Sequence, residues 1–178
     1  FPFVSNLSLN VAAMISDPES SQRQFTRVKV PQKTMARFIS IPTELSDLIP
    51  NPKYTAIPIE QVVAFNLKML FPGMKIENHY FFRVTRDAEL ELRDIEADDL
   101  MSALEEGLRK RRMGGEVVRL EVSEKISKNI LSLLMEGMSV KEEDLYHVQG
   151  LLGLDELFSL TKIKRPKLKH ELHQGITH

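Results

Sequence analysis

Three arginines in this sequence, Arg83, Arg86 and Arg119, have the type and spacing that suit a chemical task. Arg83 and Arg86 are separated by two residues in the segment RVTR. Arg119 lies in a later segment in which apolar and polar residues also alternate. A guanidinium group presents several N–H donors in a planar fork, which matches the oxygens of a phosphate group. If two paired strands bring these arginines together, the sequence predicts a contact site for phosphate or another polyanion.

The same three arginines have a structural alternative. Several acidic residues lie near them in the sequence and could pair with them on a solvated sheet face or at a domain boundary: Asp87, Glu89, Glu91 and Glu121. Structural ion pairs are the commoner use of such residues. The sequence therefore leaves both roles open.

Histidine is a second candidate for phosphate chemistry. An imidazole nitrogen is a competent nucleophile near neutral pH, and His79 directly precedes the basic segment. A surface or packing role is the alternative for His79. The histidines do not follow a zinc-binding spacing and the chain has no cysteine, so we predict no metal site and no thiol nucleophile.

Nucleotide binding by a glycine-rich loop is not indicated. Neither GxxxxGK[ST] nor GxGxxG occurs, and the doublet Gly114-Gly115 follows a helical pattern, where glycine ends a helix. The acidic pairs at residues 98–99 and 142–143 lie at predicted helix starts, where they complement the helix dipole. We therefore predict no catalytic residue and no cofactor-binding residue in this chain.

The elements that would position the arginines are mainly strands. Alternation over residues 3–15 predicts a half-buried strand, and residues 25–30 and 35–41 complete an antiparallel meander with it. After an extended connection over residues 42–54, alternation over residues 80–92 predicts a long strand or a hairpin, and alternation over residues 117–122 predicts another strand. These elements carry the arginines.

Helical patterns occupy much of the remaining sequence. They cover residues 59–70 after Pro58, residues 97–108 and residues 127–137, and another begins after Gly153 and ends at Pro166. Ser139 and Glu142 have the spacing of a capping box that opens a short turn. The predicted fold class is α+β, a mostly antiparallel sheet with helices packed largely on one face.

The composition is that of one soluble globular domain. The chain has 178 residues, of which 42% are hydrophobic and 28% charged, and its net charge is −1. This charge balance argues against a nucleic-acid partner held by overall positive charge. No apolar run approaches the roughly 20 residues of a transmembrane segment. We expect a cytoplasmic protein, with attachment to a membrane through a larger complex left open.

Several longer stretches resemble one known family. FRVTRDAELEL and RRMGGEVVRLEV, together with FPFVSNLSLN, FTRVKVPQKTMARFISIP, IPIEQVVAFNLKMLFPGM and LLGLDELFSLTKIKRPKLK, resemble the middle, or head, domain of the bacterial ATP-dependent polyphosphate kinases. These stretches occur in the family's order and cover nearly the whole chain. The resemblance implies that residues 1–165 are this domain and that residues 166–178 are a tail or linker toward catalytic domains outside the chain.

The resemblance also implies what the intact enzyme does. Such an enzyme reversibly transfers the terminal phosphate of ATP to polyphosphate through a phosphohistidine, uses Mg²⁺, and is a homo-oligomer. The nucleotide and the phosphohistidine belong to later domains, so we expect this chain alone to be an inactive structural and assembly domain. Its partners would be the other domains of the same polypeptide.

Two alternatives remain beside this expectation. One is an autonomous phosphate-handling enzyme of the phosphohistidine phosphatase type, which would use His79 with Arg83 or Arg86. The other is a protein-interaction module without affinity for phosphate.

Overall fold

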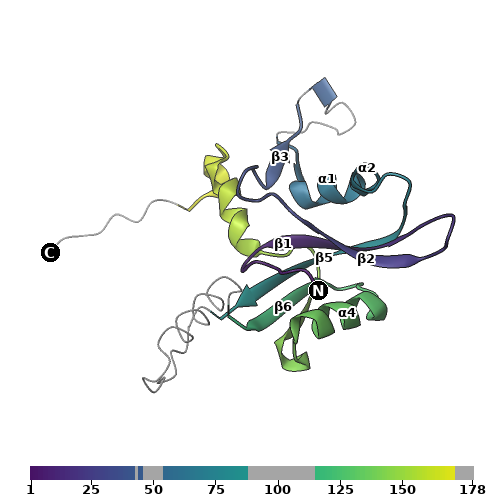
Figure 1. The fold of residues 1–178 in the computed structure, drawn as a ribbon. Coiled ribbons are helices and arrows are strands. Elements are labelled where there is room, and N and C mark those ends of the chain that lie inside the picture. Colours follow the sequence, from purple (N-terminus) through teal and green to yellow (C-terminus); the bar gives the residue numbers. More distant parts are fainter. Residues whose placement is uncertain (43, 46–53, 88–114, 171–178) are drawn as a thin grey trace, which may run out of the picture.

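The protein is built around one five-stranded sheet (Figure 1). The computed structural model describes residues 1–42, 44–45, 54–87 and 115–170. The strand order is β2-β1-β5-β6-β7, with β1 (Leu9–Ser16), β2 (Arg23–Lys29), β5 (Lys75–Arg86), β6 (Val117–Ser123) and β7 (Leu145–Val148). Each pairing is antiparallel except that of β6 with β7, which is parallel.

Strand β1 is an inner strand of the sheet, between β2 and β5, and it is buried along its whole length. Val11, for example, pairs with Val28 of β2 on one side and with Phe81 of β5 on the other. The prediction of a half-buried strand is therefore wrong. The polar position that suggested an exposed face is satisfied inside the protein, because the Asn10 side chain accepts a hydrogen bond from Arg27 and donates to the Ser8 carbonyl, both at 2.8 Å.

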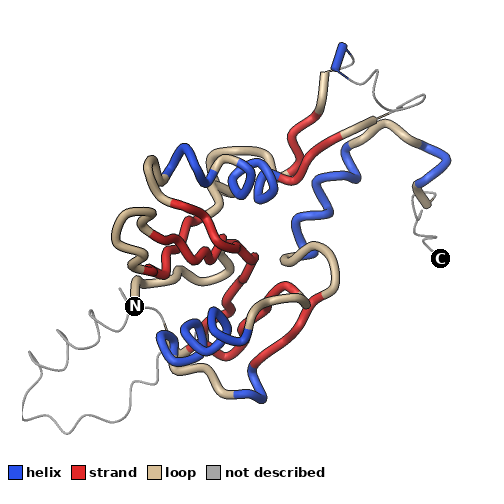
Figure 2. The backbone as a smooth tube through the Cα atoms, turned by 90° about the vertical axis from the view of Figure 1, so that its right-hand side faces the viewer, coloured by secondary structure: helices blue, strands red, loops and turns tan. Residues whose placement is uncertain are grey.

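The sheet separates two hydrophobic cores. Helix α4 (Lys128–Met138) packs on one face, where its Ile130 and Leu134 join Phe82 of β5. Helices α1 (Ile59–Phe65) and α2 (Leu67–Leu70) cover the other face, against Val11 and its neighbours. Figures 1 and 2 show the two helical layers on opposite sides of the strands.

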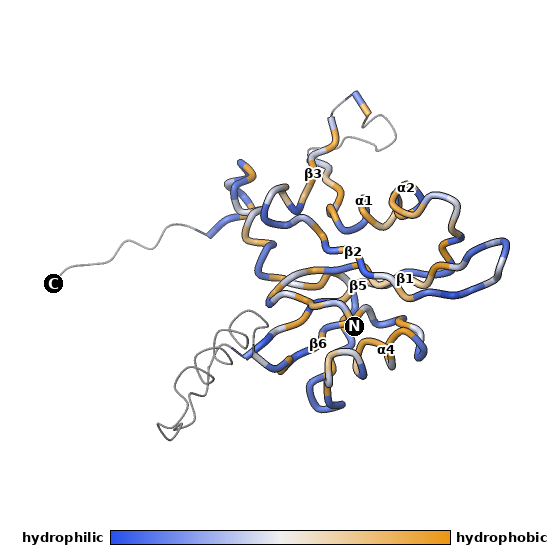
Figure 3. The backbone as a smooth tube through the Cα atoms, viewed as in Figure 1, coloured by the Kyte–Doolittle hydropathy of each residue, from blue (hydrophilic) through white to orange (hydrophobic). Residues whose placement is uncertain are grey.

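The predicted class is confirmed: the fold is α+β with a mostly antiparallel sheet. The described helices are divided between the two faces instead of gathering on one, because the inner strands are apolar on both sides. In β1, Val11 belongs to the core under α1 while Ala12 belongs to the core under α4. In Figure 3 the apolar colouring accordingly runs along α1, α2 and α4, and the turn between β1 and β2 is hydrophilic.

The predicted three-stranded meander is wrong in its third strand. Strand β3 (Phe38–Ser40) pairs with β4 (Ala56–Pro58) in a separate two-stranded sheet, and only β1 and β2 form the expected antiparallel pair. Turns after Pro31 direct the chain away from β2, since the amides of Thr34 and Met35 bond to the Pro31 carbonyl. β3 therefore meets the segment that enters α1.

The helix predicted over residues 59–70 begins after Pro58 as expected but is interrupted. The amide of Asn66 bonds to the carbonyls of Val62 and Val63, and its side chain also donates to the Val62 carbonyl at 2.8 Å. This local bonding ends α1 and starts α2. The predicted stop is confirmed at Gly73, whose φ of 81° lies in the left-handed region.

The C-terminal third contains one confirmed helix and several differences. Helix α4 starts at the predicted place, with the Ser127 side chain accepting from the Ile130 amide. Ser139 ends α4 with φ 55°, so it does not open the next turn, and the short helix η3 (Glu142–Asp144) begins after Lys141. Strand β7 was not predicted. The last helices are both of the 3-10 type, η4 (Leu154–Lys162) and η5 (Pro166–Leu168).

The helix predicted over residues 97–108, the end of the strand predicted to reach residue 92 and most of the connection over residues 42–54 lie outside the described residues. Among the helices that the structure describes, none combines the length and apolar character needed to cross a membrane.

Candidate functional site

The pairing of β5 with β6 brings two of the three predicted arginines together. Arg83 lies opposite Glu121, and Thr85 lies opposite Arg119. Because side chains alternate along a strand, Arg83 and Arg119 are diagonal neighbours on the same face, the one that α1 covers. The condition set in the sequence analysis, pairing of the two strands, is met, and Arg83 and Arg119 lie near each other.

Glu121 occupies the space between these two arginines. Its Oε1 accepts from Arg119 Nε at 2.8 Å, and its Oε2 lies 3.6 Å from Arg83 Nη1. Arg83 also reaches across to η4, where its Nη2 lies 3.4 Å from Asp155 Oδ1. The side chains of Arg83 and Glu121 are each only 11% exposed, so this pair is largely shielded from water.

Arg119 is the more accessible of the two. Its side chain is 41% exposed, and its guanidinium carbon lies 3.9 Å from the centre of the Tyr146 ring on β7. This distance is that of a cation–π contact. Arg119 therefore holds the parallel edge strand while it keeps part of its surface in solvent.

Arg86 faces a different part of the molecule. A register shift separates it from Thr85, and its guanidinium donates to the carbonyls of Val4 and Gly115, both at 2.8 Å. The same group lies 4.9 Å from the Phe3 ring. Burial lowers the pKa of Arg86 from its ordinary value. Arg86 thus fastens the N-terminal segment to the end of β5.

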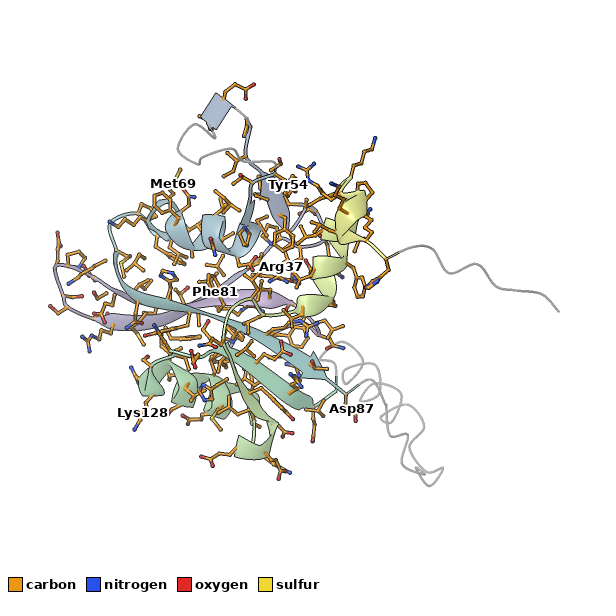
Figure 4. The ribbon with its side chains drawn as sticks, turned by 180° about the vertical axis from the view of Figure 1, so that it is seen from behind. Arg37, Tyr54, Met69, Phe81, Asp87 and Lys128 are labelled. Carbon is orange, nitrogen blue, oxygen red and sulfur yellow. The ribbon has the colours of Figure 1, made fainter. Side chains whose placement is uncertain are left out.

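A second buried arginine was missed by the sequence analysis. Arg37 Nη2 lies 2.7 Å from Glu60 Oε1, and the two side chains are only 2% and 3% exposed. Arg37 also donates to the carbonyls of Leu152 and Gly153, both at 2.6 Å. Figure 4 shows Arg37 in the interior beside η4. The available signal was Arg37 itself, a charge inside an apolar strand pattern, but nothing in the sequence indicates Glu60 as its partner.

Gly153 links the two sets of charges. A Cβ atom placed there would lie 3.2 Å from Arg83 Cδ and 3.4 Å from Arg37 Nη1, so both guanidinium groups pack against this glycine. Its φ of 62° starts η4. We call the joined set the arginine cluster; it contains Arg37, Glu60, Arg83, Arg119, Glu121 and Asp155.

A groove of about 590 Å³ adjoins the arginine cluster. One wall comes from Gln32, residues 35–38 and Tyr54, and the other from η4. Figure 4 shows Tyr54 and Arg37 on the side of β3 and β4, with η4 opposite. Its lining mixes apolar side chains such as Phe158 with charges of both signs, so the groove has no single chemical preference.

The structure does not bring His79 together with Arg83, as the hypothesis of a histidine nucleophile requires. His79 is exposed in β5, with its ring edge-on to Phe81 at 6.2 Å. Arg83 lies four residues further along the same strand, which corresponds to about 13 Å. Arg83 is also occupied by Glu121 and Asp155. Within the described ranges, no three histidine, aspartate or glutamate side chains gather closely enough to hold a metal ion.

The fold and these contacts define the class of protein: an α+β domain whose interior arginines connect strands, a helix and a C-terminal 3-10 segment. Comparison with known families agrees with this architecture. The sequence model described as the polyphosphate kinase middle domain matches residues 1–160. The chain therefore belongs to the polyphosphate kinase middle domain family, and the predicted resemblance is confirmed.

Individual relatives support the same conclusion. The chain is 67% identical to the polyphosphate kinase of Parasynechococcus marenigrum (strain WH8102) and 65% identical to that of Prochlorococcus marinus (strain MIT 9313). Each match covers 99% of this chain and 25% of the relative. The chain thus spans about a quarter of the length of these polyphosphate kinases.

A solved structure shows the same fold. The crystal structure of polyphosphate kinase from Porphyromonas gingivalis superposes with a TM-score of 0.71 at 17% identity, over 99% of this chain and 23% of that one. The domain limit predicted at residue 165 and the polyanion contact predicted for Arg83, Arg86 and Arg119 stay predictions.

Proposed function

We propose that this chain is a structural and assembly domain of a polyphosphate kinase and contributes no reacting group of its own. In the intact enzyme, domains outside this chain bind ATP and Mg²⁺ and reversibly transfer the terminal phosphate of ATP to polyphosphate through a phosphohistidine. The middle domain holds those domains in position and takes part in a homo-oligomer. Family membership and the quarter-length match to polyphosphate kinases support this proposal.

The observation that carries the proposal is the arginine cluster. Its guanidinium groups bind carboxylates and carbonyls from different elements. Arg37, which directly precedes β3, contacts α1 and the start of η4, and Arg83 joins β5 to β6 and to η4. Buried charges paired in this way fix the relative positions of the segments that carry them. The cluster thereby positions η4, the element that leads out of the sheet toward the C-terminal end.

The outer surface of α1 and α2 supports the assembly role. Phe65 at the end of α1 and Met69 and Leu70 in α2 are 88%, 78% and 53% exposed. Clustered large apolar side chains in solvent mark surfaces that contact other protein. We assign this surface to contacts with the rest of the polypeptide or with a second copy.

Labelling with ATP distinguishes the proposed structural role from the alternative, an autonomous enzyme that uses His79 as its nucleophile. The 178-residue chain is incubated with ATP labelled in its terminal phosphate and Mg²⁺, beside the intact enzyme. We expect acid-labile label on the intact enzyme and none on the chain. A matched variant, His79→Gln in the intact enzyme, should keep its rate of polyphosphate synthesis within about twofold, a change near 0.4 kcal/mol in barrier height.

The opposite pattern would support the rival. Label on the isolated chain that disappears in His79→Gln would show a phosphohistidine within this domain and would overturn the proposed function.

A further inference from the structure

The segment that contains the end of η4 and η5 concentrates positive charge. Residues 162–169, KIKRPKLK, contain five of the 24 lysines and arginines in the chain and none of its 25 aspartates and glutamates. Their formal charge is +5, and the remaining 19 basic and 25 acidic residues leave −6 for the rest. The near-neutral total therefore conceals a strongly basic stretch at residues 162–169, which we call the lysine segment.

The lysines of this segment are available to a ligand. Lys162, Lys164, Lys167 and Lys169 are all exposed. Across the part of the chain that the structure describes, none of their four ammonium groups forms an ion pair.

The acids at the start of η4 do not neutralise this charge. Asp155 faces Arg83 at 3.4 Å, and the Glu156 carboxylate accepts a hydrogen bond from the Gln32 side chain. Both carboxylates are thus held at the sheet side of η4. The four lysines at its other end are left facing solvent.

The spacing of these charges favours a linear polyanion. Eight residues span at most about 29 Å even when extended, and η5 shortens the segment. Screening in physiological salt acts over about 8 Å, so neighbouring lysines reinforce one another. A small anion meets one or two of these charges, whereas a polymer with a charge on every unit meets several at once and gains from multivalency.

Lysine is suited to such a repetitive ligand. An ammonium group on a flexible stem acts as a point charge and needs no fixed fork geometry, so it can follow a polymer in many registers. Arg83 and Arg86, in contrast, already direct their donors at carboxylates or carbonyls inside the domain.

We propose that the lysine segment is a contact surface for inorganic polyphosphate, held through Lys162, Lys164, Lys167 and Lys169. This inference rests on the proposed function, because the identity of the relatives as polyphosphate kinases selects polyphosphate among linear polyanions. It places a polyanion contact outside the three arginines that the sequence first suggested.

Fluorescence anisotropy of labelled polyphosphate tests the proposal on the 178-residue chain at about 50 and about 200 mM salt. The test variant replaces the four lysines of the segment by glutamine. The control variant makes the same change at four exposed lysines elsewhere: Lys33, Lys68, Lys125 and Lys128. Circular dichroism verifies that both variants are folded.

We expect the test variant to bind at least tenfold more weakly at the lower salt concentration. The slope of log Kd against the logarithm of the salt concentration should decrease by about one for each lysine removed. The control variant should stay within about twofold of the parent, a difference of roughly 0.4 kcal/mol.

Three results would overturn the proposal. They are no polyphosphate binding by the parent chain, equal weakening in both variants, or equally tight lysine-dependent binding of single-stranded DNA or of vesicles that contain phosphatidylserine. Each differs from failure of the proposed function, which would appear as ATP-derived label on the chain and involves none of these lysines.

Discussion

Arg37 and Glu60 form an ion pair in which neither side chain reaches solvent. The free energy of removing one partner from such a pair is large, because the other charge and its hydrogen-bonding groups stay buried without compensation. Here Arg37 also satisfies the carbonyls of Leu152 and Gly153. The pair therefore connects three parts of the chain: the residue before β3, helix α1 and the segment that enters η4.

We predict that Arg37→Met lowers the free energy of unfolding by about 3–5 kcal/mol. The double variant Arg37→Met/Glu60→Leu should recover part of this loss, since it leaves no buried carboxylate unpaired. Urea unfolding followed by circular dichroism measures both changes.

Arg23 provides the matched control for this measurement. It pairs with Glu77 at 3.0 Å, but its side chain is 69% exposed. Arg23→Met should change the free energy of unfolding by less than about 1 kcal/mol. Equal effects of Arg37→Met and Arg23→Met would contradict a structural role for the buried pair.

The start of η4 gives a second test of the arginine cluster. Gly153→Ala puts a residue with a side chain in the left-handed backbone region, which destabilises the protein by about 1–2 kcal/mol. The added methyl group would also lie 3.2 Å from Arg83. Gly150→Ala also introduces backbone strain, at φ 97°, but its Cβ would have nothing within 4 Å. We expect Gly153→Ala to shift the urea midpoint further than Gly150→Ala. Identical midpoints would mean that Arg83 does not need this close approach.

The turn between β1 and β2 has its own pH dependence. Hydrogen bonds from the Glu19 amide and the Ser20 hydroxyl lower the pKa of Asp17 below its ordinary value of 3.8. Because the folded-state pKa is depressed, the turn is stabilised above about pH 4 and loses this contribution as the pH falls through the folded value. NMR titration of the Asp17 carboxyl should give a midpoint below 3.8, and Ser20→Ala should raise it. A midpoint at or above 3.8 would contradict these bonds.

How far the sequence predicts each element depends on how local its causes are. Strand β6 and the part of β5 from residue 80 onward were predicted, because apolar and polar residues alternate along both segments. The first residues of β5, from Lys75, were missed. Helix α4 was also predicted, and in the structure the Ser127 side chain caps it within its own first turn. Both signals lie within a few consecutive residues.

The missed features depend on partners distant in the sequence. Strand β7 has four residues, and its extended form comes from parallel pairing with β6, as in Leu120 opposite Leu145. The contacts of Arg37 reach 23 residues to Glu60 and 116 residues to Gly153. No local pattern of polarity encodes such distances, so half of the arginine cluster could be found only from the fold.

For the assembled enzyme, the apolar surface of α1 and α2 gives a direct prediction. Phe65→Ser with Met69→Ser should leave the stability of the 178-residue chain within about 0.5 kcal/mol, because both side chains are already in solvent. In the intact enzyme the same pair should weaken oligomer or interdomain contacts, measured by size-exclusion chromatography and by limited proteolysis.

Lys68→Ser is the matched control, since this residue lies exposed on the same helical surface. If the double variant and Lys68→Ser give the same elution and cleavage patterns, α1 and α2 do not form an assembly surface.

The position of β1 between β2 and β5 has a consequence for how this protein is made. During translation β1 can pair at once with β2, but its other neighbour, β5, begins at Lys75, 59 positions after the end of β1. At about 5–20 residues per second, the ribosome needs roughly 3–12 s to supply that strand. For this interval the open side of an apolar strand is exposed to other nascent chains, so newly made protein should depend on chaperones mainly until β5 emerges.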